Sequence, residues 1–434
     1  MIFLGRRPTP RQRVLLVLAV VMAIVGVDCL ATAGATVVRP ESAARDQSLE
    51  GDLMVAHGDN FTTGAMVMQT ELRTATGVVP LAVPAAEHAA TLALAGERVR
   101  VRGTRDARSF AVLSVASSPA ARGALAHPQV SPRAQHTMRI AVVLMRLPGS
   151  SAEPVTTASV RASTFGARNS VASWFAEGSG GQVTVTGTVY GYYNGVKTCD
   201  LAKQLAAGAA AAKKSGFVAS DYDHLVVYTP PQPCDFGGIG WVGQNGVFLN
   251  GETAPGLMEH ELGHNLGLWH AGEYACASTK LAATCLTVYG DDTDVMGNPY
   301  ANHGYNAEHK YTLGWIPSSE VRTITSGTQT IALTASEKPV VAGAIELIRI
   351  RAADGARYAV DRRASVGYDT GLSGVWIRKL ASVGTDDTEL LRGSALAAGS
   401  AFVDPLHHVT IATLTDSGPT ASVRVCVGPC PATH

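Results

Sequence analysis

The chain has 434 residues, of which 46% are hydrophobic and 16% charged, so it can form two or three domains with buried cores. Its 35 basic and 35 acidic side chains give a formal net charge of zero. This balance argues against binding to nucleic acid or to an anionic membrane surface, and neither partner is expected.

The first 35 residues are predicted to be a signal peptide. Four arginines between positions 6 and 13 precede a continuous apolar run at 14–27, which is too short to span a membrane comfortably. Small residues around Ala33 and Ala35 offer cleavage sites. The mature protein is therefore expected to be secreted and extracellular, with an uncleaved signal anchor as the alternative.

Signal removal would take away Cys29 and leave six cysteines, an even number that is typical of an oxidising compartment. Six cysteines allow fifteen sets of pairings, and local pairs are preferred. A cysteine metal site is the rival interpretation, but the chain has no Cys-x-x-Cys pair to favour it. The preferred disulfides are Cys199–Cys234, Cys276–Cys285 and Cys426–Cys430.

The segment 36–118 is predicted to form a small β-domain, an OB-like barrel or a sandwich. Valine and arginine alternate over 97–103, which places the valines on one face of a strand and the arginines on a solvated face. No amphipathic helix is expected here. The Ala- and Pro-rich stretch at 119–135 is predicted to be a linker.

A second domain is expected over 136–318, with an α+β organisation. Its apolar and alternating runs predict strands at 140–147, 182–190 and 225–228, and helices at 163–176 and 200–214. The glycine-rich segment 237–249 contains β-friendly residues, and Pro255 suits the first turn of a following helix.

Residues 260–270 read His-Glu-Leu-Gly-His-Asn-Leu-Gly-Leu-Trp-His. His260 and His264 are four residues apart, so on a helix they lie on one face and can bind one metal ion. His270 would lie roughly 9 Å further along a continued helix and about 120° off that face. Gly267 resolves this, because glycine tolerates the left-handed conformation that ends helices.

Three neutral imidazoles leave a fourth zinc position open, which is typical of a catalytic rather than a structural zinc site. The full pattern has a chance of about one in ten thousand of arising by accident. Glu261 need not bind the metal, and is predicted to take a proton from the attacking water. Met296 lies in the later turn Asp294-Val295-Met296-Gly297, and is predicted to form an apolar floor beneath the metal.

The motif resembles that of the metzincin zinc peptidases, His-Glu-x-x-His-x-x-Gly-x-x-His, followed by a turn with a methionine. The flanking text, which includes 289–291, 294–297, 305–310 and 313–315, resembles the gametolysin-like peptidases of family M11. The resemblance implies a twisted mixed sheet with an active-site helix, bordered by an edge strand that binds extended peptides. It is specific over about 250–316 and weaker over 136–250.

Two departures from the resemblance matter. Related enzymes are kept latent by a cysteine of a pro-segment, and this chain has none between Cys29 and Cys199. The N-terminal β-domain is therefore either a permanent accessory domain or a pro-domain that covers the cleft or offers a weaker ligand such as His57 or His88. Some metzincins also use a tyrosine two residues after the methionine, where this chain has Asn298; Tyr300 and Tyr305 are the candidates nearby.

The remaining segment, 319–434, is predicted to be β-sandwich-like, with strands at 328–333, 345–350 and 375–380. Together these features predict a monomeric secreted zinc endopeptidase acting on proteins or peptides. The alternatives are a secreted binding or adhesion protein with a peptidase-like core, and a zinc hydrolase of cell-wall amide or ester bonds.

Overall fold

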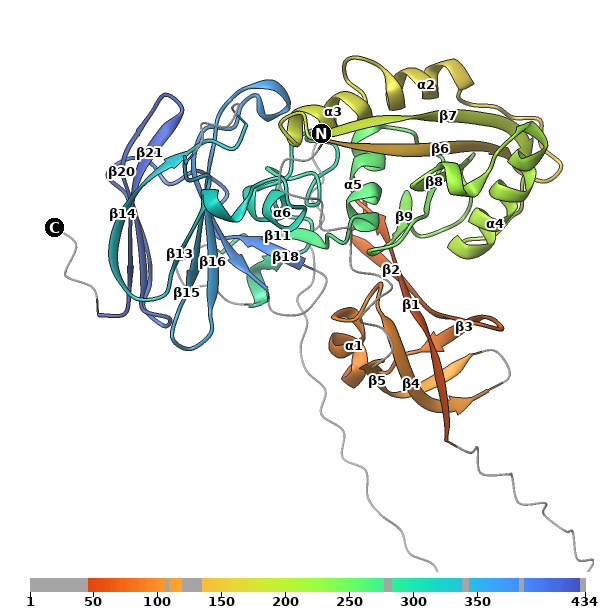
Figure 1. Ribbon diagram of the computed structural model, residues 1–434, viewed down its shortest axis with the longest axis horizontal. Helices are drawn as coiled ribbons and strands as arrows, with labels where there is room; N and C mark the ends of the chain where they lie inside the picture. Colours follow the sequence, from red (N-terminus) through yellow and green to blue (C-terminus); the bar gives the residue numbers. More distant parts are fainter. Residues whose placement is uncertain are drawn as a thin grey trace, which may run out of the picture. The chain divides into compact units, whose positions relative to one another are not determined.

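The computed structural model describes residues 46–106, 109–118, 135–276, 283–337, 343–381 and 386–429. The predicted signal peptide, Cys29 and all but the last residue of the predicted linker lie outside this part. Within it the chain is a mixed α+β protein, rich in strands and with few helices (Figure 1). None of the helices in these ranges is both long and apolar enough to cross a membrane.

The first five strands close into a ring, as in a small β-barrel. The predicted alternation is confirmed, because Val99 and Val101 are fully buried in the ring while the arginines between and after them are exposed. The strands are β1 (Gln47–Asn60), β2 (Ala65–Thr74), β3 (Gly77–Ala82), β4 (Arg98–Arg105) and β5 (Phe110–Ser117).

One helix contradicts the expectation of strands alone in this region. α1 (Ala85–Leu92) lies between β3 and β4 and follows Pro84, whose φ of −70° suits the residue before a first turn. Only Thr91 and Leu92 are buried. Two buried positions in eight residues are too few to produce a helical pattern in the sequence.

The ring and the central region share one sheet, because β1 also pairs with β9. The glycine-rich segment 237–249 forms two antiparallel strands joined by a turn. The central strands are, in spatial order, β9 (Gly238–Trp241), β10 (Val247–Asn250), β8 (His224–Thr229), β6 (His136–Arg146) and β7 (Val183–Asn194).

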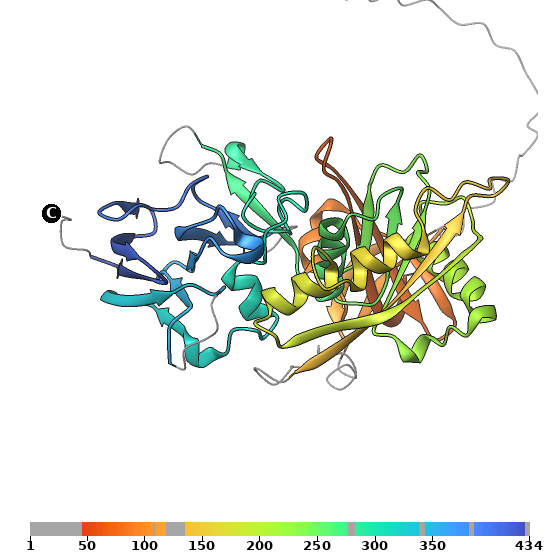
Figure 2. The same cartoon turned by 90° about the horizontal axis from the view of Figure 1, so that it is seen from above.

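Two short helices replace the single helix that was predicted at 163–176. α2 (Thr157–Phe165) ends before a loop, and α3 (Val171–Gly178) begins after Ser170. The Ser170 hydroxyl accepts a hydrogen bond from the Ser173 backbone N–H at 3.1 Å, which forms a new helix N-terminus inside the predicted one. Both helices lie along β7 (Figures 1 and 2).

The helix predicted at 200–214 is confirmed as α4 (Leu201–Ala212), followed by a short 3₁₀ turn. The Asp200 carboxylate caps its first turn, and Gly216 ends it with a φ of 87°. Ala141 and Val143 of β6 pack against Ala212 of α4 on one face of the sheet. α4 therefore covers the face opposite α2 and α3.

α5 (Pro255–Asn265) packs beside the same sheet, on the face covered by α2 and α3 (Figure 1). Leu257 and Leu262 share one apolar core with Ile140 and Val142 of β6. β6 is thus covered on both faces, which explains its nearly continuous apolar sequence.

Two further sheets share an apolar core that includes Ile348 and Ile350 from the first sheet and Ile411 and Val423 from the second. Strands β11 and β12 of the first sheet come from the segment predicted to belong to the preceding domain, and α6 (Ala307–Thr312) precedes β13. In spatial order the first sheet is β12 (Leu286–Thr287), β11 (His270–Tyr274), β18 (Asp386–Leu390), β17 (Gly374–Leu380), β16 (Arg357–Arg363), β15 (Leu347–Arg351) and β13 (Val321–Ile324). The second is β14 (Gly327–Thr334), β21 (Thr420–Val427), β20 (Val409–Ser417) and β19 (Ala401–Asp404).

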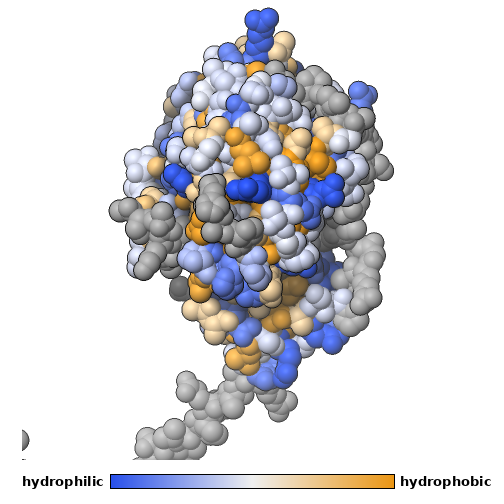
Figure 3. All heavy atoms as spheres, turned by 90° about the vertical axis from the view of Figure 1, so that its left-hand side faces the viewer, coloured by the Kyte–Doolittle hydropathy of each residue, from blue (hydrophilic) through white to orange (hydrophobic). Residues whose placement is uncertain are grey.

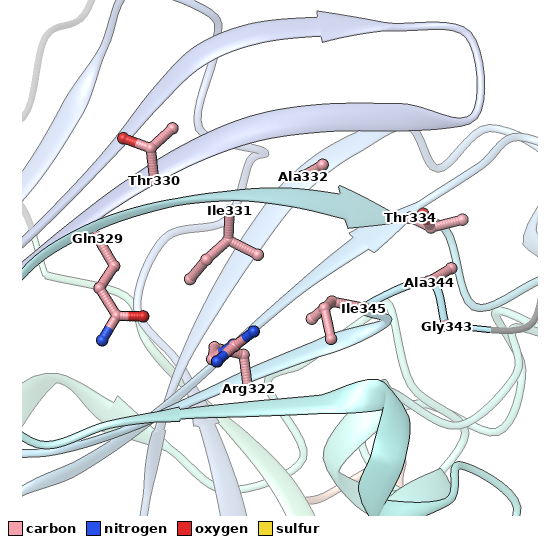
Figure 4. Close-up of a pocket in the computed structure, with 9 residues that line it drawn as sticks. All are labelled: Arg322, Gln329, Thr330, Ile331, Ala332, Thr334, Gly343, Ala344 and Ile345. Atoms are coloured by element: carbon pink, nitrogen blue, oxygen red, sulfur yellow. The ribbon is translucent and has the colours of Figure 1, made fainter.

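The face on the left-hand side of Figure 1 carries small, separate apolar groups among hydrophilic ones (Figure 3). A depression between β13 and β14 is lined by Arg322, Gln329 and Ile345, among others (Figure 4). Arg322 and Gln329 are exposed, so the depression lacks the buried polar groups that fix a ligand's orientation.

Two of the predicted disulfides, Cys199–Cys234 and Cys276–Cys285, are confirmed. The first ties the start of α4 to the segment before β9. Cys426 is disulfide-bonded, but its predicted partner Cys430 lies outside the described residues.

Candidate metal centre

Helix α5 carries His260 and His264 in its buried interior. Pro255 begins the helix, where its missing N–H leaves no hydrogen bond unmade. Every residue from Gly256 to Asn265 is buried. The Asn265 side chain holds the end of the helix against the sheet, because its amide donates to the Trp241 carbonyl oxygen at 2.9 Å.

The chain leaves α5 through Gly267, whose φ of 95° is the left-handed conformation predicted for this turn. His270 then begins β11, which pairs in parallel with β18. The Trp269 backbone N–H donates to the Asp387 carboxylate at 2.7 Å. The third histidine is therefore positioned by the C-terminal sheet as well as by the turn.

The three imidazoles converge on one carboxylate, that of Asp59 in β1. Nε2 of His260 and Nε2 of His264 lie 3.1 and 3.2 Å from Asp59 Oδ2, and Nε2 of His270 lies 3.2 Å from Oδ1. Nε2 of His264 and Nε2 of His270 are themselves 3.2 Å apart. All four side chains are fully buried.

The hydrogen bonds at Nδ1 decide what this cluster can hold. Nδ1 of His260 lies 2.9 Å from the Val295 carbonyl oxygen, and Nδ1 of His264 lies 2.9 Å from that of Leu268. A carbonyl only accepts, so both Nδ1 atoms donate, which leaves each Nε2 available to bind a metal ion on the side facing Asp59. An Nε2 lone pair and a carboxylate oxygen of Asp59 are both acceptors. At 3.1–3.2 Å they repel each other unless a cation lies between them.

The spacing of the donor atoms fits zinc. Ligands about 2.0 Å from a tetrahedral zinc ion stand about 3.3 Å apart, close to the 3.1–3.2 Å separations within the cluster. Burial lowers the pKa of His260 and His270, which keeps both rings in the neutral form that binds metals. The residues therefore fit a metal ion with three nitrogen donors.

Glu261 lies beside this cluster, with a carboxylate oxygen within 4.8 Å of the ligand atoms of His260 and Asp59. Neither oxygen has a hydrogen-bond partner among the described residues. A side chain at Gly238 would clash with the carboxylate, and one at Gly240 would lie 3.1 Å from it. The glycines of β9 thus leave room for Glu261, whose pKa is raised by burial and by the Asp59 charge.

The turn that contains Met296 packs beneath α5. The Met296 side chain is fully buried and lies against Gly263, where any larger residue would meet its sulfur. Asp294 Oδ1 accepts the Met296 backbone N–H at 2.7 Å and so fixes the turn. No hydrogen bond or ion pair links Met296 to the histidines in the described part of the chain, in keeping with a structural role.

Two buried arginines of the C-terminal sheet hold the same region. Arg378 on β17 donates to Asp291 at 2.7 Å and to the Thr293 hydroxyl at 2.5 Å. Arg363 on β16 donates to the carbonyl oxygens of Thr293 and Gly304 at 3.1 and 3.3 Å. The sequence reasoning missed these residues; an arginine within an apolar strand was the available signal.

The two tyrosines proposed from the sequence have other partners. The Tyr305 hydroxyl donates to the Glu259 carbonyl oxygen at 3.2 Å, and the Tyr300 hydroxyl donates to the Glu252 carboxylate at 2.9 Å. Tyr305 is fully buried, whereas Tyr300 is 53% exposed. Neither hydroxyl contacts the histidine cluster.

Tyr289 is the tyrosine that does reach the cluster. Its hydroxyl donates to Asp59 Oδ1 at 2.5 Å, and its ring centroid lies 4.4 Å from that of His270. Tyr289 has a positive φ of 59°, which is uncommon for a residue with a side chain. Position 289 belongs to the flanking text that resembles the M11 peptidases, but it lies upstream of the methionine turn, where no catalytic tyrosine was expected.

Asp59 was also missed, whereas His57 was considered. His57 Nδ1 lies 2.8 Å from Asp59 Oδ1, and its ring centroid lies 4.3 Å from that of His270. His88, the other histidine considered, is exposed on α1. A His-x-Asp pair in a strand places both side chains on one face, which was the available signal.

Below this centre, a buried ion pair joins Asp294 to His309 of α6, with Oδ2 and Nδ1 2.9 Å apart. Burial opposes both charges, but Asp294 and the nearby Asp387 raise the pKa of His309, and His309 lowers that of Asp294. Arg378 also faces His309 and acts in the opposite direction.

We expect the Asp294–His309 ion pair to make a pH-dependent contribution to the free energy of unfolding. A raised histidine pKa stabilises the fold fully below about pH 6.5, and the effect is lost as pH rises through the folded pKa. The lowered Asp294 pKa stabilises above about pH 3.9 and is lost as pH falls. His309→Gln should cost on the order of 3 kcal/mol near pH 6 and less at pH 9. Urea unfolding of both proteins at these two pH values tests this; an equal cost at both would contradict it.

The comparisons identify the class first: residues 152–348 match a peptidase family, so the chain contains a peptidase domain, and peptidases are hydrolases. The matching model is that of the gametolysin peptidases, M11. The matched stretch contains the three histidines, Glu261 and Met296, but none of the ring β1–β5.

Other comparisons add little. No curated protein matches the chain. A solved chain from "Structure of a chaperone-substrate complex" is 14% identical, with a TM-score of 0.25. The match covers 50% of this chain and 36% of that chain, about a third of its length. At this score the likeness carries no information on fold or function.

Proposed function

We propose that the protein is a secreted zinc endopeptidase of metzincin type that cleaves peptide bonds of extracellular proteins. The observation that carries the proposal is the convergence of three buried imidazole Nε2 atoms beside the unpartnered carboxylate of Glu261. His260, His264 and His270 would hold the metal. Two disulfides are compatible with an extracellular location.

Bound zinc supplies a Lewis acid that polarises the scissile carbonyl and makes water acidic enough to react near neutral pH. Glu261 accepts the proton of the attacking water and delivers it to the departing amine. Burial raises the pKa of the Glu261 carboxylate, which favours its role as proton acceptor. Tyr289 donates its hydroxyl hydrogen to the oxygen on which negative charge develops.

Strand β9 is the proposed substrate-binding edge. It forms a pair with β10 on one side, and on its other side its backbone can pair with an extended peptide. Such binding uses main-chain hydrogen bonds and needs few side-chain pockets. This supports polypeptides, rather than small esters, as the substrate class.

Casein cleavage by the purified protein tests the proposal. The protein, either intact or after limited proteolysis, should cleave casein, lose this activity with a chelator and recover it with added zinc. The intact chain and the chain after limited proteolysis should both be assayed. If neither form cleaves casein or other unfolded proteins in the presence of zinc, the peptidase proposal fails.

Tyr289→Phe should lower kcat about 10²-fold, because one donor to the developing oxyanion is removed. KM and metal content should change little. The assay belongs in an Asp59→Ala background, in which the hydroxyl has no carboxylate partner. Tyr300→Phe is the matched control, since its hydroxyl contacts Glu252 instead. A kcat within twofold of the parent would contradict this role for Tyr289.

A further inference from the structure

Strand β1 lies along the edge of β9 where a substrate would bind. The two strands run antiparallel, with Asp59 opposite Gly238. The Gly237 N–H donates to the Asp59 carbonyl oxygen and the Val242 N–H to that of Val55, both at 2.8 Å. These are the main-chain bonds that an added peptide strand would make. β1 therefore occupies the proposed substrate edge.

Three residues of this segment lie at the metal centre: His57 and Asp59, which share one face of β1, and Phe61 in the turn that follows it. Asp59 contacts all three imidazoles through its two carboxylate oxygens. His57 bonds to the Asp59 carboxylate from one side. On the other side, the Phe61 ring lies 4.9 Å from the ring of His260 and 5.2 Å from that of Tyr289.

The Asp59 carboxylate stands where water and substrate would have to bind. It is fully buried, and its oxygens lie at ligand-to-ligand distances from the three Nε2 atoms. Its second oxygen receives the Tyr289 hydroxyl, as a substrate oxygen would in the proposed mechanism. With a metal bound by the three imidazoles, Asp59 would be a fourth protein ligand, as in a closed site.

The covering segment is firmly anchored. Met54 and Ala56 of β1 share a buried apolar core with Ile239 and Trp241. From β2, the Gln69 side chain donates to the Cys199 carbonyl oxygen at 2.6 Å and accepts the Leu201 N–H at 3.0 Å. The interaction between ring and cleft is thus part of the folded core rather than a surface contact.

We propose that Asp59 is the fourth ligand of the metal in the intact chain, and that β1 blocks the cleft so that the protein is a latent precursor. The inference rests on the proposed function for its metal and its substrate edge. Activation exchanges the Asp59 carboxylate for water when β1 leaves β9, with no redox step. With Asp59 as the blocking ligand, latency requires no cysteine in the N-terminal segment.

The first test measures metal access rather than turnover. The cobalt-substituted full chain is titrated with acetohydroxamic acid, a small metal-binding probe, and the visible absorption is recorded. Asp59→Ala and the isosteric Asp59→Asn should bind the probe at least about 10²-fold more tightly than the parent, because an intramolecular competitor has been removed. Asp52→Ala is the matched control, since Asp52 lies on the same strand and pairs with Arg98 outside the site.

The second test measures cleavage of casein by the same full-length proteins loaded with zinc. Both Asp59 variants should be at least about 10²-fold faster than the parent, and Asp52→Ala should match the parent. Equal probe affinity and equal cleavage rates in parent and Asp59→Asn would overturn the inference. Tighter probe binding without cleavage would uphold Asp59 as a ligand while the peptidase function fails, so the two failures are distinguishable.

Discussion

Replacing Glu261 by Ala is expected to reduce kcat by about 10²–10⁴-fold while the protein keeps one zinc ion per molecule. The loss follows because Glu261 is the side chain proposed to carry the proton from water to the leaving amine. Metal binding should persist, since the three imidazoles supply the ligands. The rate should be measured in the parent or the Asp59→Ala background, whichever cleaves casein faster, with elemental analysis of each protein.

Glu259→Gln is the matched control for this variant. Glu259 lies on the same helix, is fully buried, and has no partner for its carboxylate within the described residues. Burial raises its pKa well above the usual value, which favours the neutral carboxyl form that Gln imitates closely. The control should retain both metal and turnover. Near-parental cleavage by Glu261→Ala would refute the assigned role.

Replacing His264 by Ala is expected to remove both the metal and nearly all turnover. His264 lies between the other ligands: its Nε2 is 3.2 Å from that of His270 and from Asp59 Oδ2. Without it, the site keeps two imidazoles and the Asp59 carboxylate, and zinc affinity should fall below the level that survives dialysis. Elemental analysis after dialysis measures the loss.

Stability provides a second readout for His264→Ala. A metal that binds only the folded state stabilises it by about 4 kcal/mol at a free concentration of about 1,000 times Kd. A chelator should therefore lower the Tm of the parent but leave that of His264→Ala unchanged. His303→Ala, whose ring bonds to the Tyr368 carbonyl oxygen, is the control and should respond like the parent. Full zinc occupancy in His264→Ala would contradict the ligand assignment.

Local features of the sequence were enough to predict much of the architecture. The alternation of valine and arginine in β4 reflects a strand with one buried face, and Gly216 and Gly267 both adopt the left-handed conformation that ends a helix. Predictions failed where the local signal was weak or broken, as in α1 with its two buried residues and at Ser170, where a capping box divides one helix into two. Short elements carry too few buried positions to form a pattern.

The proposed metal-binding motif can be recognised in the sequence because its residues lie within eleven positions. Two of its histidines have helical spacing, and a glycine turn brings in the third. Its partners are distant: Asp59 is 201 residues from His260, and Asp387 is 118 residues from Trp269. No spacing rule links such residues. Only the packing of β1 along β9, and of the C-terminal sheet on β11, brings them together.

The sequence by itself therefore determined the chemistry that the centre can hold, since residue type and local spacing decide which atoms can share one metal ion. The tertiary structure alone decided whether that centre is open. Asp59 closes it through strand pairing over the substrate edge, and the buried arginines Arg363 and Arg378 hold the turn beneath it. Both depend on contacts between segments that fold together from far apart in the chain, where sequence separation carries no geometric information.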